Sequence, residues 1–259
     1  MLKNNFLKEK LESGKIVIGT WLIMPSIVSA DIVASCGLDF VVIDSEHGPA
    51  NFETAQNMII ACESRGVSPC LRVGGICEAD ILKSLDIGSH CIHIPNINSR
   101  QDAEECIKFV KYPPLGIRGF SPFNRAGNYF SGYSRELTSI ANKSVMLAVH
   151  IEGKEAIQNI DNILKIKGID IIFIGLFDIS KSLGIPGRVE DKRVTEILVN
   201  LTKKVNKAGK YPGSIVTNSK QLEIFIHYGV RYITYSADCE VLSNGYRRIV
   251  DDFKDISKQ

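Results

Sequence analysis

The feature that most constrains the fold is a series of eight short apolar segments, each followed by a stretch with helical character. The segments are rich in β-branched residues, as expected for strands that are covered on both faces. They lie at residues 16–23, 39–44, 69–73, 91–94, 145–151, 170–175, 211–216 and 231–236. Strands that alternate with helices form parallel sheets, so eight such units predict a single (β/α)8 TIM barrel of the α/β class.

Helix boundaries between the strands support this prediction. Asn51 and Ser99 precede helical stretches, where their side chains can cap free amides, and Gly66 and Gly229 follow such stretches. A last helix is predicted over 239–258. A doubly wound open sheet is the alternative, but the sequence has no GxGxxG or GxxxxGK[ST] loop to support its nucleotide-binding form.

One connection, residues 113–143, is much longer than the others. Long connections in compact domains are commonly functional or disordered. Its Arg118, Arg125, Tyr129 and Tyr133 favour a lid or a substrate-binding loop.

Composition excludes several classes of protein. The 259 residues carry 31 basic and 29 acidic side chains, a net charge of +2, so a basic nucleic-acid surface is not expected. No apolar run is long enough to span a membrane, and the N-terminal residues lack the apolar core of a signal peptide. We therefore expect one cytoplasmic domain over 1–259. Its seven cysteines form no CxxC motif and are expected to be buried, reduced thiols, with a catalytic cysteine as the alternative.

Ionisable residues follow several of the predicted strands. A barrel active site lies at the carboxyl ends of its strands, so these residues are candidates for one site. They are Asp44, Glu46 and His47 after the second strand, Arg72 after the third, His150 and Glu152 after the fifth, and Asp178 after the sixth.

The chemistry of this set is limited. A guanidinium can bind a carboxylate or polarise a ketone, two carboxylates can bind a divalent cation, and an imidazole can move protons near neutral pH. Together they indicate enolisation beside a carbonyl and the making or breaking of a carbon–carbon bond. Phosphoryl transfer fits poorly because no phosphate loop is present.

Each candidate also has a structural interpretation. Arg72 could form an ion pair across strand ends, and Asp178 could cap a helix. His47 could be a hydrogen-bonded rim residue, and Glu152 could favour a helix N-terminus. His93 could be a packed or a surface residue.

Seven ordered motifs carry a family resemblance. They are GTWL (19–22), DFVVIDSEHGP (39–49), LRVG (71–74), LDIG (85–88), YPPLGIRG (112–119), VHIEGKEAIQNI (149–160) and FIGLFDIS (173–180). Nearly the whole chain resembles the class II hydroxy-oxo-acid aldolases, which include the 2,4-dihydroxyhept-2-ene-1,7-dioate and 2-keto-3-deoxy sugar acid aldolases of the phosphoenolpyruvate/pyruvate superfamily.

The resemblance implies a catalytic set. His47 is implied to be the acid/base imidazole, steadied by Asp86, and Arg72 to contact the 2-oxo-acid carbonyl and stabilise the enolate. Glu152 and Asp178 are implied to be the carboxylates that bind a divalent metal.

It also implies how the substrate is held. Backbone amides around Phe177 and Asp178, with Ser121 nearby, are implied to bind the substrate carboxylate, and Asp44 to support the site. Members of the family are homo-oligomers with sites near subunit interfaces.

Four residues depart from the family pattern. Leu176 and Phe177 stand where the family has a Pro-Ala pair, His150 replaces a glutamine, and Gly153 replaces a threonine. These changes crowd the carboxylate pocket, with His150 beside the substrate, and alter the surroundings of any metal. With these departures the chain resembles a divergent branch of the family, the citrate synthases of siderophore biosynthesis. The resemblance implies that this branch needs no metal.

This resemblance therefore implies a citrate synthase that condenses oxaloacetate with acetyl-CoA to citrate and CoA. Which group removes the methyl proton stays open among Glu152, Asp178, His47, His150 and His93. The first alternative is an aldolase that cleaves a 4-hydroxy-2-oxo acid to pyruvate with Mg²⁺ or Mn²⁺ at Glu152 and Asp178. The second is a non-catalytic sensor of 2-oxo acids. No nucleic-acid or membrane partner is expected.

Overall fold

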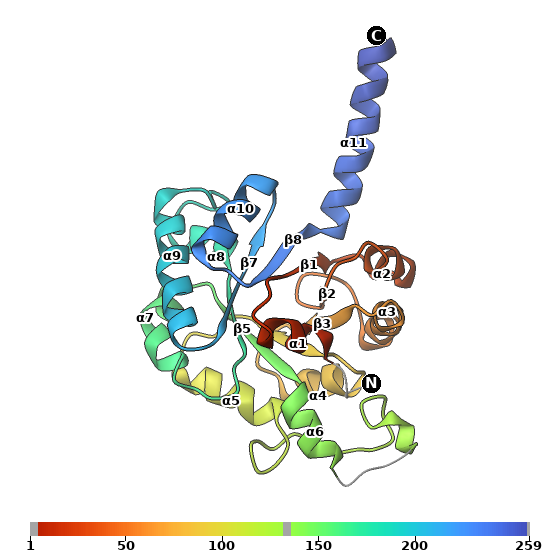
Figure 1. Ribbon diagram of the computed structural model, residues 1–259, viewed down its shortest axis with the longest axis vertical. Helices are drawn as coiled ribbons and strands as arrows, with labels where there is room; N and C mark the ends of the chain where they lie inside the picture. Colours follow the sequence, from red (N-terminus) through yellow and green to blue (C-terminus); the bar gives the residue numbers. More distant parts are fainter. Residues whose placement is uncertain (1–4, 132–135, 258–259) are drawn as a thin grey trace.

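The computed structural model describes residues 5–131 and 136–257 and shows a closed barrel of eight parallel strands surrounded by helices (Figure 1). The strands are β1 (Val17–Leu22), β2 (Phe40–Asp44), β3 (Ser68–Arg72), β4 (Cys91–Ile94), β5 (Met146–Ile151), β6 (Ile171–Ile174), β7 (Tyr211–Val216) and β8 (Tyr232–Ala237). Each pairs in parallel with the next, and β8 closes onto β1. The predicted TIM barrel and its eight strands are confirmed, and the open-sheet alternative is wrong.

Helices connect these strands. They are α1 (Phe6–Glu12), α2 (Ile27–Ala34), α3 (Phe52–Ser64), α4 (Glu78–Asp86), α5 (Arg100–Val110), α6 (Leu137–Ser144), α7 (Lys154–Ile163), α8 (Leu176–Ser182), α9 (Lys192–Lys207), α10 (Ser219–Tyr228) and α11 (Asp238–Ser257), with a 3-10 turn, η1 (Asn128–Phe130). The predicted caps are present, because the side chain of Asn51 accepts a hydrogen bond from the amide of Thr54, and Ser99 forms a capping box with Asp102.

Side chains along each strand point alternately into the barrel and toward the helices. In β2, Phe40 and Val42 belong to the cluster inside the barrel, whereas Val41 and Ile43 belong to the cluster beneath the helices. The same alternation directs Asp44, the last residue of β2, inward at the carboxyl end. The strand ends therefore deliver their polar residues to one place.

The long connection between β4 and β5 differs from its prediction. Helix α6 begins at Leu137, inside the predicted 113–143 segment, and Tyr133 lies outside the described residues. Arg118 is 3% exposed and donates to Asp86 at 2.8 Å, and Arg125 is 8% exposed and pairs with Glu63. These two arginines hold the connection against the barrel, so their expected role in substrate binding is not supported.

The cysteines divide between the core and the surface. Cys62, Cys70, Cys91 and Cys106 are buried, as expected. Cys36, Cys77 and Cys239 are exposed, which the apolar surroundings in the sequence did not predict, and all seven are free thiols.

Helix α11 leaves the barrel and extends away from it, the blue helix in Figure 1. Leu242, Tyr246, Ile249, Phe253 and Ile256 are exposed along it. Their spacing of four and three residues places them on one face, so α11 carries an apolar stripe that the barrel does not cover.

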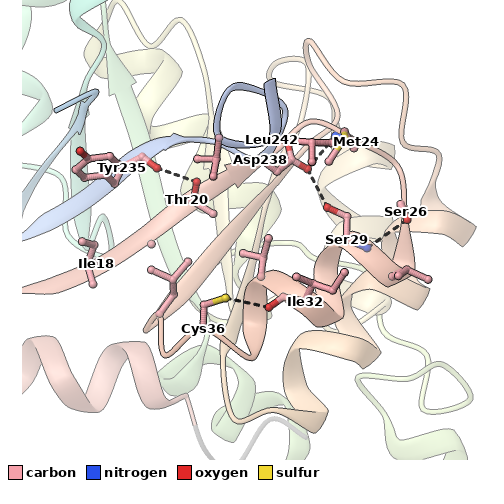
Figure 2. Close-up of a pocket in the computed structure, with 15 residues that line it drawn as sticks. Ile18, Thr20, Met24, Ser26, Ser29, Ile32, Cys36, Tyr235, Asp238 and Leu242 are labelled. Atoms are coloured by element: carbon pink, nitrogen blue, oxygen red, sulfur yellow. Dashed lines mark hydrogen bonds between the residues drawn. The ribbon is translucent and has the colours of Figure 1, made fainter. Parts of the chain in front are cut away.

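An apolar cavity of about 560 Å³ lies where α11 departs, between β1, α2 and β8. Figure 2 shows Ile18, Ile32 and Leu242 around this cavity, together with polar side chains that bond to one another or to the backbone. Thr20 donates to the carbonyl of Tyr235 at 2.8 Å, and the hydroxyl of Ser29 donates to Asp238 at 3.4 Å.

Among residues 5–131 and 136–257, no helix combines the length and the apolar character that a membrane span requires.

Close packing inside the barrel makes Gly19 of β1 sensitive to substitution. A Cβ there would lie 2.5 Å from Cε2 of Phe40 and closer still to that residue's carbonyl oxygen. Gly19→Ala is expected to lower the free energy of unfolding by about 1–3 kcal/mol through overpacking, measured by urea denaturation. Gly74→Ala is the control, because nothing lies within 4 Å of its added Cβ. Equal stability of the two variants would contradict the packing.

Candidate active site

Arg72 is held on three sides at the carboxyl end of β3. Its Nε and Nη2 donate to the two carboxylate oxygens of Asp44 at 2.9 and 2.6 Å, and Nη1 lies 3.0 Å from Oε2 of Glu46. Its guanidinium also stacks on the ring of Trp21, 4.4 Å from the centroid. The expected ion pair across strand ends is therefore present, and it fixes the direction of the guanidinium.

Asp44 also shapes the turn after β2. Its Oδ1 accepts hydrogen bonds from the backbone amides of Glu46 and His47 at 3.0 and 3.3 Å. Burial raises the pKa of the Asp44 carboxyl, but the bonds and charge of Arg72 and the two amides outweigh it, so the pKa is lowered. Burial raises the pKa of Glu46, only partly opposed by Arg72. Asp44 is thus the permanent counter-charge of Arg72.

Glu152 is the buried carboxylate after β5. It is 8% exposed, and its Oε1 accepts from the backbone amide of Asn96 at 2.7 Å. A Cβ at Gly175 would lie 2.8 Å from Oε2 of Glu152, so glycine is needed there to admit the carboxylate. Burial raises the pKa of Glu152, but the His150 ring, the Asn96 amide and Arg72 together outweigh that effect. The pKa is therefore lowered, and the ionised form is favoured.

His150 lies beneath Glu152, inside the barrel. Its Nδ1 is 3.8 Å from Oε2 of Glu152, and its other nitrogen contacts His93 at 3.0 Å. His93 is completely buried, so its interpretation as a packed residue is confirmed.

These groups line a cavity of about 300 Å³ at the mouth of the barrel. Its lining is Trp21, Ile23, Asp44, His47, Arg72, His150, Glu152, Phe173, Gly175, Leu176, Phe177, Asp178, Ile215 and Ala237. Seven predicted site residues therefore meet here: Asp44, His47, Arg72, His150, Glu152, Phe177 and Asp178.

Two other predicted residues are not among the described residues of this lining. Asp86 pairs with Arg118 at 2.8 Å, and the Ser121 hydroxyl accepts from the amide of Phe123 at 3.4 Å. The side chain of His47 is 67% exposed, and its Nε2 lies 4.0 Å from Glu46. That Asp86 steadies His47, and that Ser121 helps hold substrate, both stay predictions.

The sequence argument assigned no role to Glu46, Trp21, Phe173 or Gly175. Glu46 was visible in the charged segment after β2, and Trp21 is the only tryptophan of the chain. Taking every second residue of each predicted strand as inward-facing would have found Trp21 and Phe173. The approach of Gly175 to Glu152 depends on tertiary packing and left no local signal.

Glu152 and Asp178 are the groups that could hold a divalent cation in this cavity. Both offer carboxylate oxygens, the donors that Mg²⁺ and Mn²⁺ prefer. One oxygen of Glu152 already accepts from Asn96, and the half-exposed Asp178 side chain pairs with Lys181 at 3.6 Å. The donor types fit such an ion, with water or substrate required to complete its shell.

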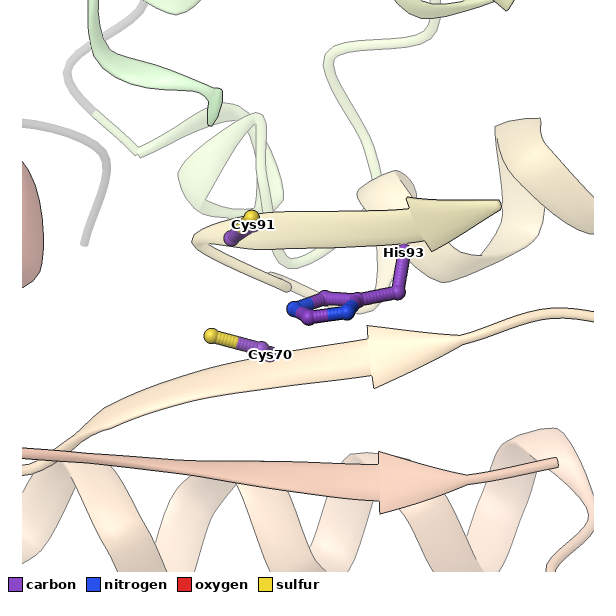
Figure 3. A group of neighbouring side chains, drawn as sticks. All are labelled: Cys70, Cys91 and His93. Carbon is purple, nitrogen blue, oxygen red and sulfur yellow. The ribbon is translucent and has the colours of Figure 1, made fainter. Parts of the chain in front are cut away.

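Within the described ranges, one trio has ligand atoms close enough for a metal: Cys70, Cys91 and His93 inside the barrel (Figure 3). Burial raises the pKa of the Cys91 thiol well above its usual value, which disfavours the thiolate that a metal needs. Both nitrogens of His93 are already bonded, to His150 and Tyr232. This trio therefore belongs to the core.

Comparison with known proteins gives consistent matches along the chain. The HpcH/HpaI aldolase/citrate lyase family matches residues 18–245. The 4-hydroxy-2-oxo-heptane-1,7-dioate aldolase of Salmonella arizonae is 31% identical over 255 residues, which cover 97% of this chain and 95% of that protein.

Two solved structures are similar to this chain over nearly its whole length. The citrate synthase SbnG superposes with a TM-score of 0.89 at 28% identity, covering 100% of both chains. The HpcH/HpaI aldolase of Desulfitobacterium hafniense DCB-2 superposes with a TM-score of 0.91 at 28% identity, covering 96% of both. Identity alone does not separate the two activities.

The Asp44–Arg72 pair predicts a pH-dependent contribution to stability. The folded-state pKa of Asp44 is lowered, so its contribution is present above the unfolded pKa and lost as pH falls through the folded value. Asp44→Asn leaves the largely buried guanidinium of Arg72 short of charge and is expected to lower the free energy of unfolding at neutral pH by about 3 kcal/mol. The difference from the unsubstituted protein should shrink below about pH 4.

Asp31→Asn is the matched control, because Asp31 forms the same two-pronged contact with Arg65 on the surface. Exposed pairs contribute little, so no measurable change is expected. Urea denaturation across pH measures both variants, and equal losses would contradict the special role of the buried pair.

Proposed function

The chain belongs to the HpcH/HpaI aldolase/citrate lyase family of enzymes, and from that premise we propose that it condenses oxaloacetate with acetyl-CoA to give citrate and CoA. The observation that carries this proposal is a cavity lined by Arg72 and Glu152 together with the apolar side chains of Leu176 and Phe177. The full-length likeness to a citrate synthase structure supports it. Citrate for siderophore biosynthesis is the proposed purpose.

Arg72 is the group proposed to polarise the ketone of oxaloacetate. Its guanidinium is fixed by Asp44, Glu46 and Trp21, so it can meet the ketone oxygen of oxaloacetate without reorganising. Negative charge develops on that oxygen as the new carbon–carbon bond forms, and a preorganised cation stabilises it. The product alkoxide is then protonated, and water hydrolyses citryl-CoA to citrate and CoA.

Glu152 is the proposed acceptor of the acetyl-CoA methyl proton. Its lowered pKa keeps the carboxylate ionised, as a base requires, and it lines the cavity. Asp178 lines the cavity as well but is half exposed and pairs with Lys181. His93 is absent from the lining and His47 is mostly exposed, so both are weaker candidates.

A specific observation also favours the aldolase alternative. Curated relatives near 30% identity are 4-hydroxy-2-oxo-heptane-1,7-dioate aldolases, and both candidate metal carboxylates, Glu152 and Asp178, line the cavity. A divalent cation held there would polarise the oxo-acid and its enolate. Arg72 would again stabilise the oxygen that carries developing charge. The citrate synthase proposal differs in requiring no metal.

An assay of CoA release separates these activities. Chelator-treated protein receives oxaloacetate and acetyl-CoA, free thiol is followed, and citrate is identified by mass spectrometry. Release of both products supports the proposal. Pyruvate formed from a 4-hydroxy-2-oxo acid only after Mg²⁺ or Mn²⁺ is added, without citrate synthesis, supports the aldolase instead. Binding of 2-oxo acid with neither reaction would indicate a sensor.

Two variants test the assigned residues. Arg72→Ala and Glu152→Gln are each expected to lower kcat by at least roughly 10²-fold, because they remove charge stabilisation and proton transfer. Arg65→Ala and Glu104→Gln make the same changes at exposed ion pairs and should retain activity. Near-normal turnover of both site variants would contradict the assignment.

For partners, we propose that the active form is a homo-oligomer in which α11 of one copy covers the apolar cavity of another. Each copy carries an apolar stripe on α11 and an apolar cavity beside β1 and α2. Exchange of the helix between two copies would bury both surfaces. The stripe repeats every four and three residues from Leu242 to Ile256, the spacing by which helices pack together.

Charge on the stripe tests the oligomer. Ile249→Glu with Phe253→Glu is expected to reduce the molar mass measured by light scattering, because burying the stripe would then bury unpaired charge. Arg247→Glu lies on the opposite face of α11 and should leave the mass unchanged. A monomeric unsubstituted protein, or equal masses for all three, would contradict the proposal.

A further inference from the structure

A row of bonded side chains leads from the cavity into the barrel. Nε2 of His150 lies 3.0 Å from Nδ1 of His93, and Nε2 of His93 lies 2.8 Å from the hydroxyl of Tyr232. That hydroxyl is also 3.7 Å from Sγ of Cys70. His93 and Tyr232 do not appear in the described lining of the cavity, and the contact of His93 with His150 joins their hydrogen-bonded row to it.

Aromatic walls enclose the two imidazoles. The Trp21 ring meets His93 edge-on with 5.8 Å between centroids, and the Phe173 ring lies 4.8 Å from that of His150. In such apolar surroundings each ring nitrogen depends on the few polar partners available to it. The order of donors and acceptors along the row therefore decides which nitrogen of His150 carries its proton.

His93 transmits that order because it is neutral. Burial, then the nearby His150 and Arg72, lower the pKa of His93 well below its usual value. A neutral imidazole donates from one nitrogen and accepts at the other. If Nε2 of His93 accepts a hydrogen bond, then Nδ1 must donate.

Tyr232 supplies the first donor. Burial, with Cys70 and Cys91 close by, raises the pKa of Tyr232 well above its usual value, so the hydroxyl keeps its proton. The imidazole nitrogen at 2.8 Å is a stronger acceptor than the sulfur at 3.7 Å. The hydroxyl is also placed to donate to Sγ of Cys70, but the shorter contact and the stronger acceptor favour donation to Nε2 of His93, and His93 then donates to Nε2 of His150.

We propose that His93 is a positioning residue that acts through His150 on Glu152. With Nε2 of His150 accepting from His93, the His150 proton stays on Nδ1, the nitrogen 3.8 Å from Oε2 of Glu152. The opposite order would turn a nitrogen lone pair toward a carboxylate. At 3.8 Å this contact is longer than a hydrogen bond, and such contacts in catalytic sites tighten when substrate binds.

This inference deepens the proposed function, since it concerns the carboxylate that is proposed to take the methyl proton. It requires a donor at one place, Nδ1 of His93, and nothing else from that ring. If His93 served only to fill the barrel, the activity of a variant would depend on the volume and apolar character of the new side chain. The two roles, hydrogen-bond donor and space filler, therefore predict opposite orders of activity for two substitutions.

His93→Asn and His93→Leu are the variants that separate them. Asparagine retains an amide donor near the place of Nδ1, whereas leucine removes every polar atom but fills apolar space better. The first measurement needs no substrate: ¹⁵N NMR of histidine-labelled protein reports which nitrogen of His150 is protonated, with His150→Gln identifying the signal. The expected result is Nδ1–H in the unsubstituted protein and in His93→Asn, and loss of that preference in His93→Leu.

Steady-state kinetics give the second measurement. His93→Leu is expected to lower kcat by roughly tenfold or more, because small misplacements of a reacting group are costly, while KM changes less. His93→Asn should retain most activity even though it is the less stable of the two in urea. Ser214→Ala, which removes another buried hydroxyl from the barrel wall, is the control and should retain kcat.

The outcomes distinguish this inference from the proposed function. A protein that makes no citrate but shows the expected NMR pattern refutes the citrate synthase and keeps the positioning role, and kinetics are then measured on pyruvate release. Nε2–H on His150 in the unsubstituted protein overturns the inference whatever the reaction. Activity that follows stability, with leucine better than asparagine, also overturns it.

Discussion

Closure of the barrel is the constraint on which the site depends. Eight strands of this size leave an interior only wide enough for side chains, and every second residue must enter it. Most inward positions hold apolar groups such as Phe40, Met146 and Phe173. At the carboxyl end the same alternation brings in Asp44 and Arg72, which must then satisfy each other's charge because little water reaches them.

The contacts that balance the charge of Arg72 also fix the direction of its guanidinium. Asp44 takes two of its nitrogens and Glu46 a third, while Trp21 lies under its plane. A lysine could not occupy such a fork, because its point charge lacks the planar geometry. Burial raises the pKa of both carboxyls, but the bonds and charge of Arg72 and two backbone amides outweigh it at Asp44, so the pKa of Asp44 is lowered and that of Glu46 is raised. The site therefore pairs a fixed anion with one that gains a proton more readily.

The sequence allowed the barrel and the ionisable residues of the lining to be predicted, because both follow from local pattern. Apolar runs end where charged residues begin, and in a barrel those ends meet, so Arg72 and Glu152 could be identified without coordinates. The fate of Arg118 and Arg125 could not, because burial of an arginine depends on partners distant in sequence, here Asp86 and Glu63. No spacing of residues in the sequence indicates such pairs. On an exposed loop, the same two arginines would have suited a substrate anion.

Two features left unexplained by one copy of the chain have a common physical solution. Asp86 and Ser121 carry roles implied by family resemblance but are not in the described lining of the cavity, and α11 exposes an apolar face to water. An apolar surface of that length is stable only when covered. The cavity beside β1 and α2 has matching chemistry and lies in the same copy at the root of α11. Leu242, at the start of the stripe, lines that cavity, but the outward course of the helix carries the following stripe residues away from it. A second copy can supply the cover, and an assembly of that kind could also bring another copy's residues toward the mouth of the barrel.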